Sequence, residues 1–280
     1  MTNMVDNTTA RAIPAGTSPS TADPVTADRV MGNLVKAELL KLRTTRMFLG
    51  NAIAALAFVP MTLAITIQTA GQEGAGPALD TAEGLRNVLS AASSGTVILL
   101  ILGILIMAGE FRHNTATSTF LVCPDRRRVV GAKLIASSMV GAGLAVAASA
   151  VTMAVGLPWL AAKDVPVDLL GADVGLVLFG SILATALYAL VGVGVGSLLR
   201  NQTVALAVAL VWVMVVESLV VSFLPEVGRW LPGGAVAALT GVSTIEGGLL
   251  PMWAGALLFA AYGLAFAAAG TRLAVQRDIT

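Results

Sequence analysis

Residues 174–224 read VGLVLFGSILATALYALVGVGVGSLL, then RNQ, then TVALAVALVWVMVVESLVVSFL. Only Arg200, Asn201 and Gln202 separate the two apolar stretches. A helix of about 20 apolar residues crosses the hydrocarbon core of a bilayer, which is roughly 30 Å thick. One continuous helix would be about twice the required length, and it would place the charge of Arg200 inside the membrane, which is costly. The stretch therefore predicts two membrane-spanning helices joined by a tight hairpin.

Four further stretches have the same apolar character, and they lie at about residues 47–67, 89–108, 134–160 and 251–270. Hydrophobic residues make up 56% of the chain and charged residues 12%, and the mean hydropathy is +0.86. A soluble domain carries about twice that charged fraction. With 174–199 and 203–224, these stretches predict an all-α polytopic membrane protein with six transmembrane helices.

The basic residues predict the orientation of the six spans. Of the 17 Lys and Arg residues, all but Arg86, Lys163 and Arg229 fall on the side that holds both ends of the chain. The side richer in Lys and Arg is the cytoplasmic one. We therefore expect a multi-pass protein of the cell (plasma) membrane, with its N- and C-termini in the cytoplasm.

The chain ahead of the first span divides into two parts. Residues 1–32 are polar and lack apolar periodicity, which predicts a disordered cytoplasmic tail, and residues 33–280 are expected to form the transmembrane domain. Within 33–46, leucines and Val35 oppose Lys36, Glu38, Lys41 and Arg43 at helical spacing. This pattern favours an amphipathic helix in the cytoplasmic interface. The alternative is a cytoplasmic extension of the first span with snorkelling lysines.

Two short helices are expected on the outer side. Asp80 and Glu83 have the spacing of a capping box ahead of the second span, which predicts a helix starting there. Residues 235–239 are semi-apolar and lie between glycine-containing segments. They are far too short for a seventh span, so they predict a re-entrant or surface helix.

The segment 109–133 lies on the predicted cytoplasmic side. Pro124 should end any helix that begins near Thr115, and three arginines, 126–128, follow it. A short helix in such a loop is an element that a partner protein can bind. The alternative is an ordinary loop whose arginines enforce the topology and contact anionic lipids.

Glu217 is an acidic residue within the fifth apolar stretch, five residues after Trp212. An acidic side chain at the centre of a spanning helix costs roughly 2.5–3.5 kcal/mol, so it should face protein or a wet cavity. One interpretation places Glu217 and Trp212 in a substrate path. The other is a protonated or paired glutamate near the outer interface.

Several chemistries lack the residues they need. None of the four lysines belongs to a GxxxxGK[ST] phosphate loop, so the chain cannot hydrolyse ATP by P-loop chemistry. Glu110 and His113 could share a helix face, but the chain has one His and one Cys. We therefore expect no metal site and no hydrolase. A Gly192-x-x-x-Gly196 pattern permits close helix approach, within one subunit or, alternatively, in a dimer.

Several motifs together resemble the ABC-2 family of ABC transporter permeases, and its actinobacterial members in particular. They are KAELLKLR at 36–43, GEFRHNT at 109–115, PDRRR at 124–128, LRNQ at 199–202 and RDIT at 277–280. The resemblance covers nearly all of residues 35–280. It implies that 33–46 is an elbow helix and that 115–122 contains a coupling helix, which docks on a nucleotide-binding subunit. The residues expected at that contact are Glu110, Arg112, Thr115, Thr117, Ser118, Thr119, Phe120 and Leu121.

The resemblance also implies a function. The chain would be the permease of an exporter, with no cofactor of its own, and ATP and Mg would bind a separate ABC ATPase. A second permease copy, identical or different, would complete the membrane part. Apolar spans and short outer loops suit an amphipathic drug, a peptide antibiotic or a lipid-like substrate. The alternatives are a membrane enzyme, which the missing site residues disfavour, and a non-transporting anchor or sensor that recruits a cytoplasmic partner.

Overall fold

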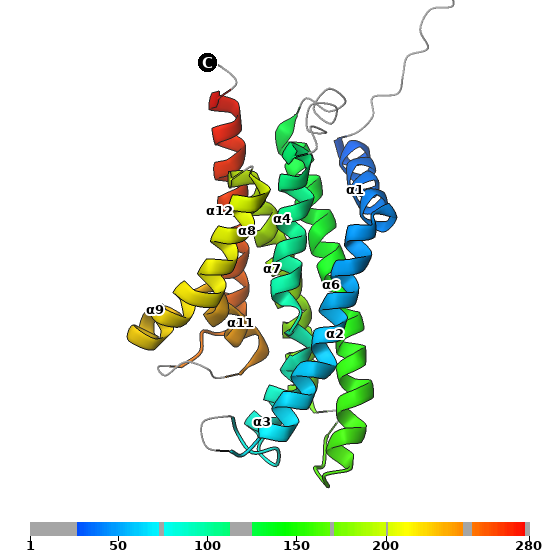
Figure 1. Ribbon diagram of the computed structural model, residues 1–280, viewed down its shortest axis with the longest axis vertical. Helices are drawn as coiled ribbons and strands as arrows, with labels where there is room; N and C mark the ends of the chain where they lie inside the picture. Colours follow the sequence, from blue (N-terminus) through cyan, green and yellow to red (C-terminus); the bar gives the residue numbers. More distant parts are fainter. Residues whose placement is uncertain are drawn as a thin grey trace, which may run out of the picture.

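The computed structural model describes residues 27–72, 76–112, 125–168, 171–199, 201–242 and 248–277. All regular structure in these ranges is helical (Figure 1). The helices are α1 (Ala27–Thr44), α2 (Arg46–Thr69), α3 (Ala82–Leu89), η1 (Ser90–Ser93), α4 (Thr96–Arg112), α6 (Arg126–Ala161), α7 (Ala172–Leu199), α8 (Gln202–Val211), η2 (Trp212–Val216), α9 (Glu217–Phe223), α10 (Pro225–Gly228), α11 (Pro232–Thr240) and α12 (Met252–Arg277).

Six helical segments in the described residues are long and apolar enough to cross a membrane, which confirms the predicted number of spans. They are Arg46–Thr69, Ala82–Arg112, Arg126–Ala161, Asp173–Leu199, Gln202–Phe223 and Met252–Leu273. The predicted hairpin is also confirmed, because α7 ends at Leu199 and α8 begins at Gln202. Asn201 starts α8 by accepting hydrogen bonds from the N–H groups of Thr203 and Val204.

Helix α7 lies at the centre of the bundle and packs against α4, α6 and α12 (Figure 1). Glycines allow this close packing. The Gly192 and Gly196 pair faces α4, where a Cβ on Gly192 would lie 2.9 Å from the Cα of Gly103. Gly194 faces α12, where its Cβ would lie 2.6 Å from the carbonyl oxygen of Gly263. The small residues of α7 therefore serve packing within one subunit.

The starts of α6 and α3 differ from the sequence expectation. The helix that contains the predicted span 134–160 begins at Arg126, because Asp125 caps it by accepting hydrogen bonds from the N–H groups of Arg127 and Arg128. Helix α3 is capped by Thr81 and not by Asp80, since the Thr81 hydroxyl accepts from the N–H of Gly84 at 3.0 Å.

The amphipathic segment forms a helix, α1, that is separate from the first span. Thr45 has extended backbone angles and interrupts the helix between Thr44 and Arg46. Helix α1 begins at Ala27, six residues before the predicted start. It packs on α6, and Figure 1 places it at the same end of the bundle as the end of α12.

The fifth span contains an irregular turn, and a short buried helix, α11, follows it further along the chain. Residues Trp212–Val216 form a π-helical turn between α8 and α9, a feature that often occurs at functional sites. Helix α11 packs against α7 and α12, and Ala235 and Leu239 on it are fully buried. The predicted helix at 235–239 therefore packs into the helix bundle and does not lie on its surface.

Candidate functional site

Four charged side chains from three helices form a closed cluster at the α1 end of the bundle. We call Glu38, Lys41, Glu110 and Lys133 the charge cluster. The Nζ of Lys133 lies 2.7 Å from Oε2 of Glu38 and 2.7 Å from Oε1 of Glu110. The Nζ of Lys41 lies 2.8 Å from Oε1 of Glu38 and 3.3 Å from Oε1 of Glu110. Each carboxylate therefore contacts both ammonium groups, and the charges alternate around the cluster.

The helices bring these side chains together from distant parts of the sequence. Glu38 and Lys41 are one turn apart on α1, Glu110 is in the last turn of α4, and Lys133 is about two turns into α6. The side chain of Lys133 is 1% exposed, that of Glu38 is 8% and that of Glu110 is 12%, whereas that of Lys41 is 52% exposed. Lys133 is the buried centre of the cluster, and Lys41 covers it from the solvent side.

Electrostatics in the cluster favour the ionised side chains on α1. Burial alone would raise the pKa of Glu38, but the charge and hydrogen bond of Lys133, with those of Lys41, hold this pKa below its usual value. Burial acts to lower the pKa of Lys41, and the Glu38 and Glu110 carboxylates more than offset it and raise this pKa. Both α1 groups are therefore charged at neutral pH.

The charge cluster joins the two helices that flank the predicted coupling segment. Residues 113–124 connect the end of α4 to the start of α6, and Glu110 and Lys133 tie these two ends to each other and to α1. Arg112 donates a hydrogen bond from Nη1 to the side-chain oxygen of Gln202 on α8, at 3.4 Å. The cluster and this contact therefore link α1, α4, α6 and α8 next to the two ends of this segment.

The predicted contact residues fall into two groups. Glu110 and Arg112 lie on α4 and belong to the contacts above. The others lie outside the described residues, and they are Thr115, Thr117, Ser118, Thr119, Phe120 and Leu121.

Sequence reasoning missed Lys133, Glu38 and Lys41 as parts of one site. The expectation of a basic segment at 109–133 included Lys133. However, four uncharged residues, Val129 to Ala132, separate Lys133 from Arg128, and a long apolar stretch follows it directly. A lysine so placed on a spanning helix needs an acidic partner. Glu38, which stands between two lysines on an otherwise basic helix face, was the matching signal.

The predicted path residue Glu217 has a definite partner. It is 6% exposed, and its Oε1 accepts a hydrogen bond from the backbone N–H of Gly233. Gly233 follows Pro232 in the first turn of α11, where N–H groups have no partner within the helix and the helix dipole is positive. Glu217 therefore caps α11 from another helix, which accounts for an acidic group within the fifth span.

Trp212 lines an apolar cavity of about 260 Å³ between α4, α7, α8, η2, α11 and α12. Tyr188, Pro232, Tyr262 and Phe266 also line it, and Glu217 does not. The hydroxyl of Tyr262 donates to the carbonyl oxygen of Trp230 at 2.8 Å, which orients this ring. Trp212 and Pro232 therefore line the same cavity. Glu217 lies next to this lining, because it binds Gly233, the residue after Pro232.

Comparison with known families decides the class of this membrane protein. The model of a family described as ABC-2 family transporter protein matches residues 34–216, which is more than half of the chain. The chain belongs to the ABC-2 transporter family. The match runs from α1 through η2, so it includes the charge cluster and Trp212. No curated protein matches the chain.

Membership in the ABC-2 family establishes the general role of the chain. It is an ABC transporter permease with several membrane spans, the transport component of a system whose ATPase is an associated protein. The matched segment also contains residues 109–133, which run from the end of α4 into the first two turns of α6. The four residues of the charge cluster therefore lie within the range that the family model matches.

Proposed function

We propose that this ABC-2 permease is the membrane subunit of an exporter that forms the substrate path and is driven by a separate ABC ATPase. In this proposal both termini and the charge cluster lie in the cytoplasm, as the excess of Lys and Arg on that side favours. ATP and Mg bind the ATPase subunit. A second permease copy, identical or different, completes the membrane part in the plasma membrane.

The charge cluster is the observation that carries the proposal. Coupling requires that a movement of residues 113–124 reaches the spans. Glu110, before this segment, and Lys133, after it, are both joined to α1 by ion pairs with Lys41 and Glu38. Glu110 and Arg112, with Thr115, Thr117, Ser118, Thr119, Phe120 and Leu121, are the proposed ATPase contact. A displacement of this contact would move α1, α4 and α6 as one unit.

The cavity beside Trp212 supports a substrate with a large apolar part. Its lining is apolar and aromatic, with the tyrosines 188 and 262 as the hydroxyl-bearing residues. Binding sites for small amphipathic molecules are typically apolar, with a few polar groups that fix orientation. We propose that the path carries an amphipathic drug, a peptide antibiotic or a lipid-like compound, and that Trp212 contacts it.

The coupling proposal predicts that the cluster controls ATP hydrolysis. The tagged permease is purified in nanodiscs with its ATPase, and hydrolysis is measured with and without daunorubicin. We expect Glu110→Gln to reduce the permease-dependent stimulation of ATP hydrolysis about tenfold, because it removes the carboxylate that contacts both Lys41 and Lys133. Glu226→Gln, on short helix α10 far from the cluster in sequence, is the control and should leave stimulation unchanged.

Two outcomes would contradict this proposal. If no ATPase that contains a phosphate loop co-purifies with the permease, the chain does not couple to one. If the ATPase binds but ethidium, daunorubicin and nisin all fail to enter inverted vesicles, a non-transporting anchor or sensor is favoured. In that case Ala substitution at Thr117 to Leu121 should still release the ATPase.

A second test concerns Glu217, which we propose lies next to the path through its contact with α11. Glu217→Gln keeps an oxygen that can accept from Gly233 and removes the negative charge. If the charge attracts cationic substrates, ethidium uptake into inverted vesicles should fall by about tenfold, the equivalent of 1.4 kcal/mol. Uptake of an uncharged substrate should be unchanged. If the variant takes up both substrates as fast as the wild type does, the role of Glu217 is restricted to capping α11.

A further inference from the structure

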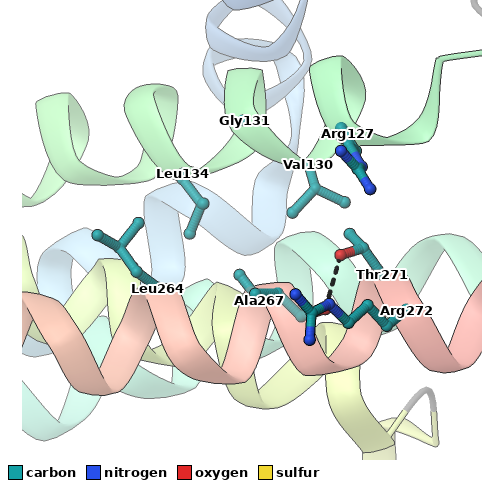
Figure 2. Close-up of a pocket in the computed structure, with 9 residues that line it drawn as sticks. Arg127, Val130, Gly131, Leu134, Leu264, Ala267, Thr271 and Arg272 are labelled. Carbon is teal, nitrogen blue, oxygen red and sulfur yellow. Dashed lines mark hydrogen bonds between the residues drawn. The ribbon is translucent and has the colours of Figure 1, made fainter.

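A second hollow, of about 330 Å³, lies between α6 and α12 on the outside of the bundle at the charge-cluster end. We call it the α6–α12 groove, and its lining residues are Arg127, Val130, Gly131, Leu134, Leu264, Ala267, Ala268, Thr271 and Arg272. Gly131, Ala267 and Ala268 leave room for it because their side chains are small. Figure 2 shows Val130 and Leu134 pointing from α6 toward α12, with Leu264 and Ala267 facing them.

Two arginines from different helices meet at one end of the α6–α12 groove. Arg127 is in the first turn of α6 and Arg272 is near the end of α12, and Figure 2 places both at the same end of the gap. No acidic residue lines the groove. The nearest acid in sequence, Asp125, binds Nε of Arg128 at 3.0 Å. Neither arginine side chain forms an ion pair with a described carboxylate, so their two like charges favour an anion between them.

The rest of the groove is apolar and extends into the membrane. Arg127 and Leu134 on α6 are seven residues apart, and Leu264 and Arg272 on α12 are eight apart, so the groove runs about 10 Å along both helices. Leu264 is 53% exposed on the surface of a spanning helix. In a bilayer this surface faces acyl chains. The groove therefore presents positive charge at headgroup depth and apolar side chains directly below.

We propose that the α6–α12 groove is a binding site for an anionic phospholipid, whose phosphate lies between Arg127 and Arg272 and whose acyl chain lies on Leu134 and Leu264. Basic pockets between spanning helices suit such headgroups. A soluble anion would use the arginines but not the apolar floor. Because α6 also carries Lys133, the bound lipid would join α12 to one of the three helices that form the charge cluster.

Native mass spectrometry tests the site on the full-length protein, exchanged into detergent with equal amounts of phosphatidylglycerol and phosphatidylcholine. We expect phosphatidylglycerol to bind preferentially to the wild type. The Arg127→Gln/Arg272→Gln variant should lose about tenfold in apparent affinity for phosphatidylglycerol, as expected when two basic contacts to an anionic headgroup are removed. Arg127→Lys/Arg272→Lys keeps both charges and should retain most of the preference.

The control is Arg43→Gln/Arg46→Gln, which removes two exposed charges at the same end but outside the groove. It should bind phosphatidylglycerol like the wild type. An equal loss in both double variants would show general surface attraction and overturn the proposal, as would no loss in either. Ala268→Phe should reduce binding by filling the groove. Displacement of the lipid by millimolar glycerol phosphate would instead indicate a site for soluble anions.

Discussion

Replacing Lys133 by Met is expected to lower the free energy of unfolding by about 3–5 kcal/mol, the cost of removing one partner from a buried ion pair. The variant leaves Glu38 and Glu110 facing each other with only the half-exposed Lys41 between them. The measurement is the thermal unfolding midpoint in detergent, followed by intrinsic tryptophan fluorescence. A midpoint equal to that of the wild type would show that the cluster does not hold α1 on α6.

Lys41→Met is the matched control for this prediction. It makes the same substitution in the same cluster, but its side chain is 52% exposed, so solvent screens the interaction and the expected loss is only about 0.2–1 kcal/mol. The triple variant Glu38→Gln/Glu110→Gln/Lys133→Met removes the buried charges together. It should recover much of the lost stability, since uncompensated charge is what makes the single change costly.

Acid should weaken the same cluster. Because the folded pKa of Glu38 is lowered, the stability that its ionisation contributes is present above the ordinary value of 4.5 and is lost as the pH falls through the lowered pKa. The raised pKa of Lys41 acts at the other limit, where stability is lost as the pH rises beyond 10.5. The difference between the wild type and Glu38→Gln should therefore be constant at neutral pH and shrink below pH 4.5.

Gly103→Ala is expected to destabilise the protein by about 1–3 kcal/mol, as overpacking does in a close-packed core. The added Cβ would meet the carbonyl oxygen of Ala189 and would lie 2.9 Å from both Gly192 Cα and Val193 N. These are backbone atoms of α7, so no side chain can rotate away and the helices must separate. Because α7 is the central helix, the change would also disturb its contacts with α6 and α12.

Gly143→Ala, on α6, is the control for the glycine prediction, because a Cβ there meets no atom within 4 Å. Alanine is the better helix former, so this variant should gain up to about 1 kcal/mol. The same unfolding measurement should thus give shifts of opposite sign for the two changes. Shifts of the same sign would mean that the α4–α7 contact is not as close as described.

The sequence by itself determined the number of spans. Six apolar stretches, the Asn201 turn and the helical nature of residues 235–239 follow from local length, charge and turn chemistry. The helix of the third span begins before its apolar stretch, at Arg126, although the three arginines after Pro124 suggested a loop. Asp125 is a helix cap at that position, and a cap can begin a helix with charged residues when they stay at the membrane surface.

Only the tertiary structure decided which side chains meet. Lys133 contacts Glu38 across 95 residues and Glu110 across 23, and Glu217 reaches Gly233 on a separate helix. In a soluble helix, an apolar stripe would indicate the buried face. In a membrane helix the faces toward lipid and toward protein are both apolar, so hydrophobic periodicity does not reveal the rotation of a helix or its neighbours. Which charges pair depends on that rotation, and the packing of small residues around α7 fixes it.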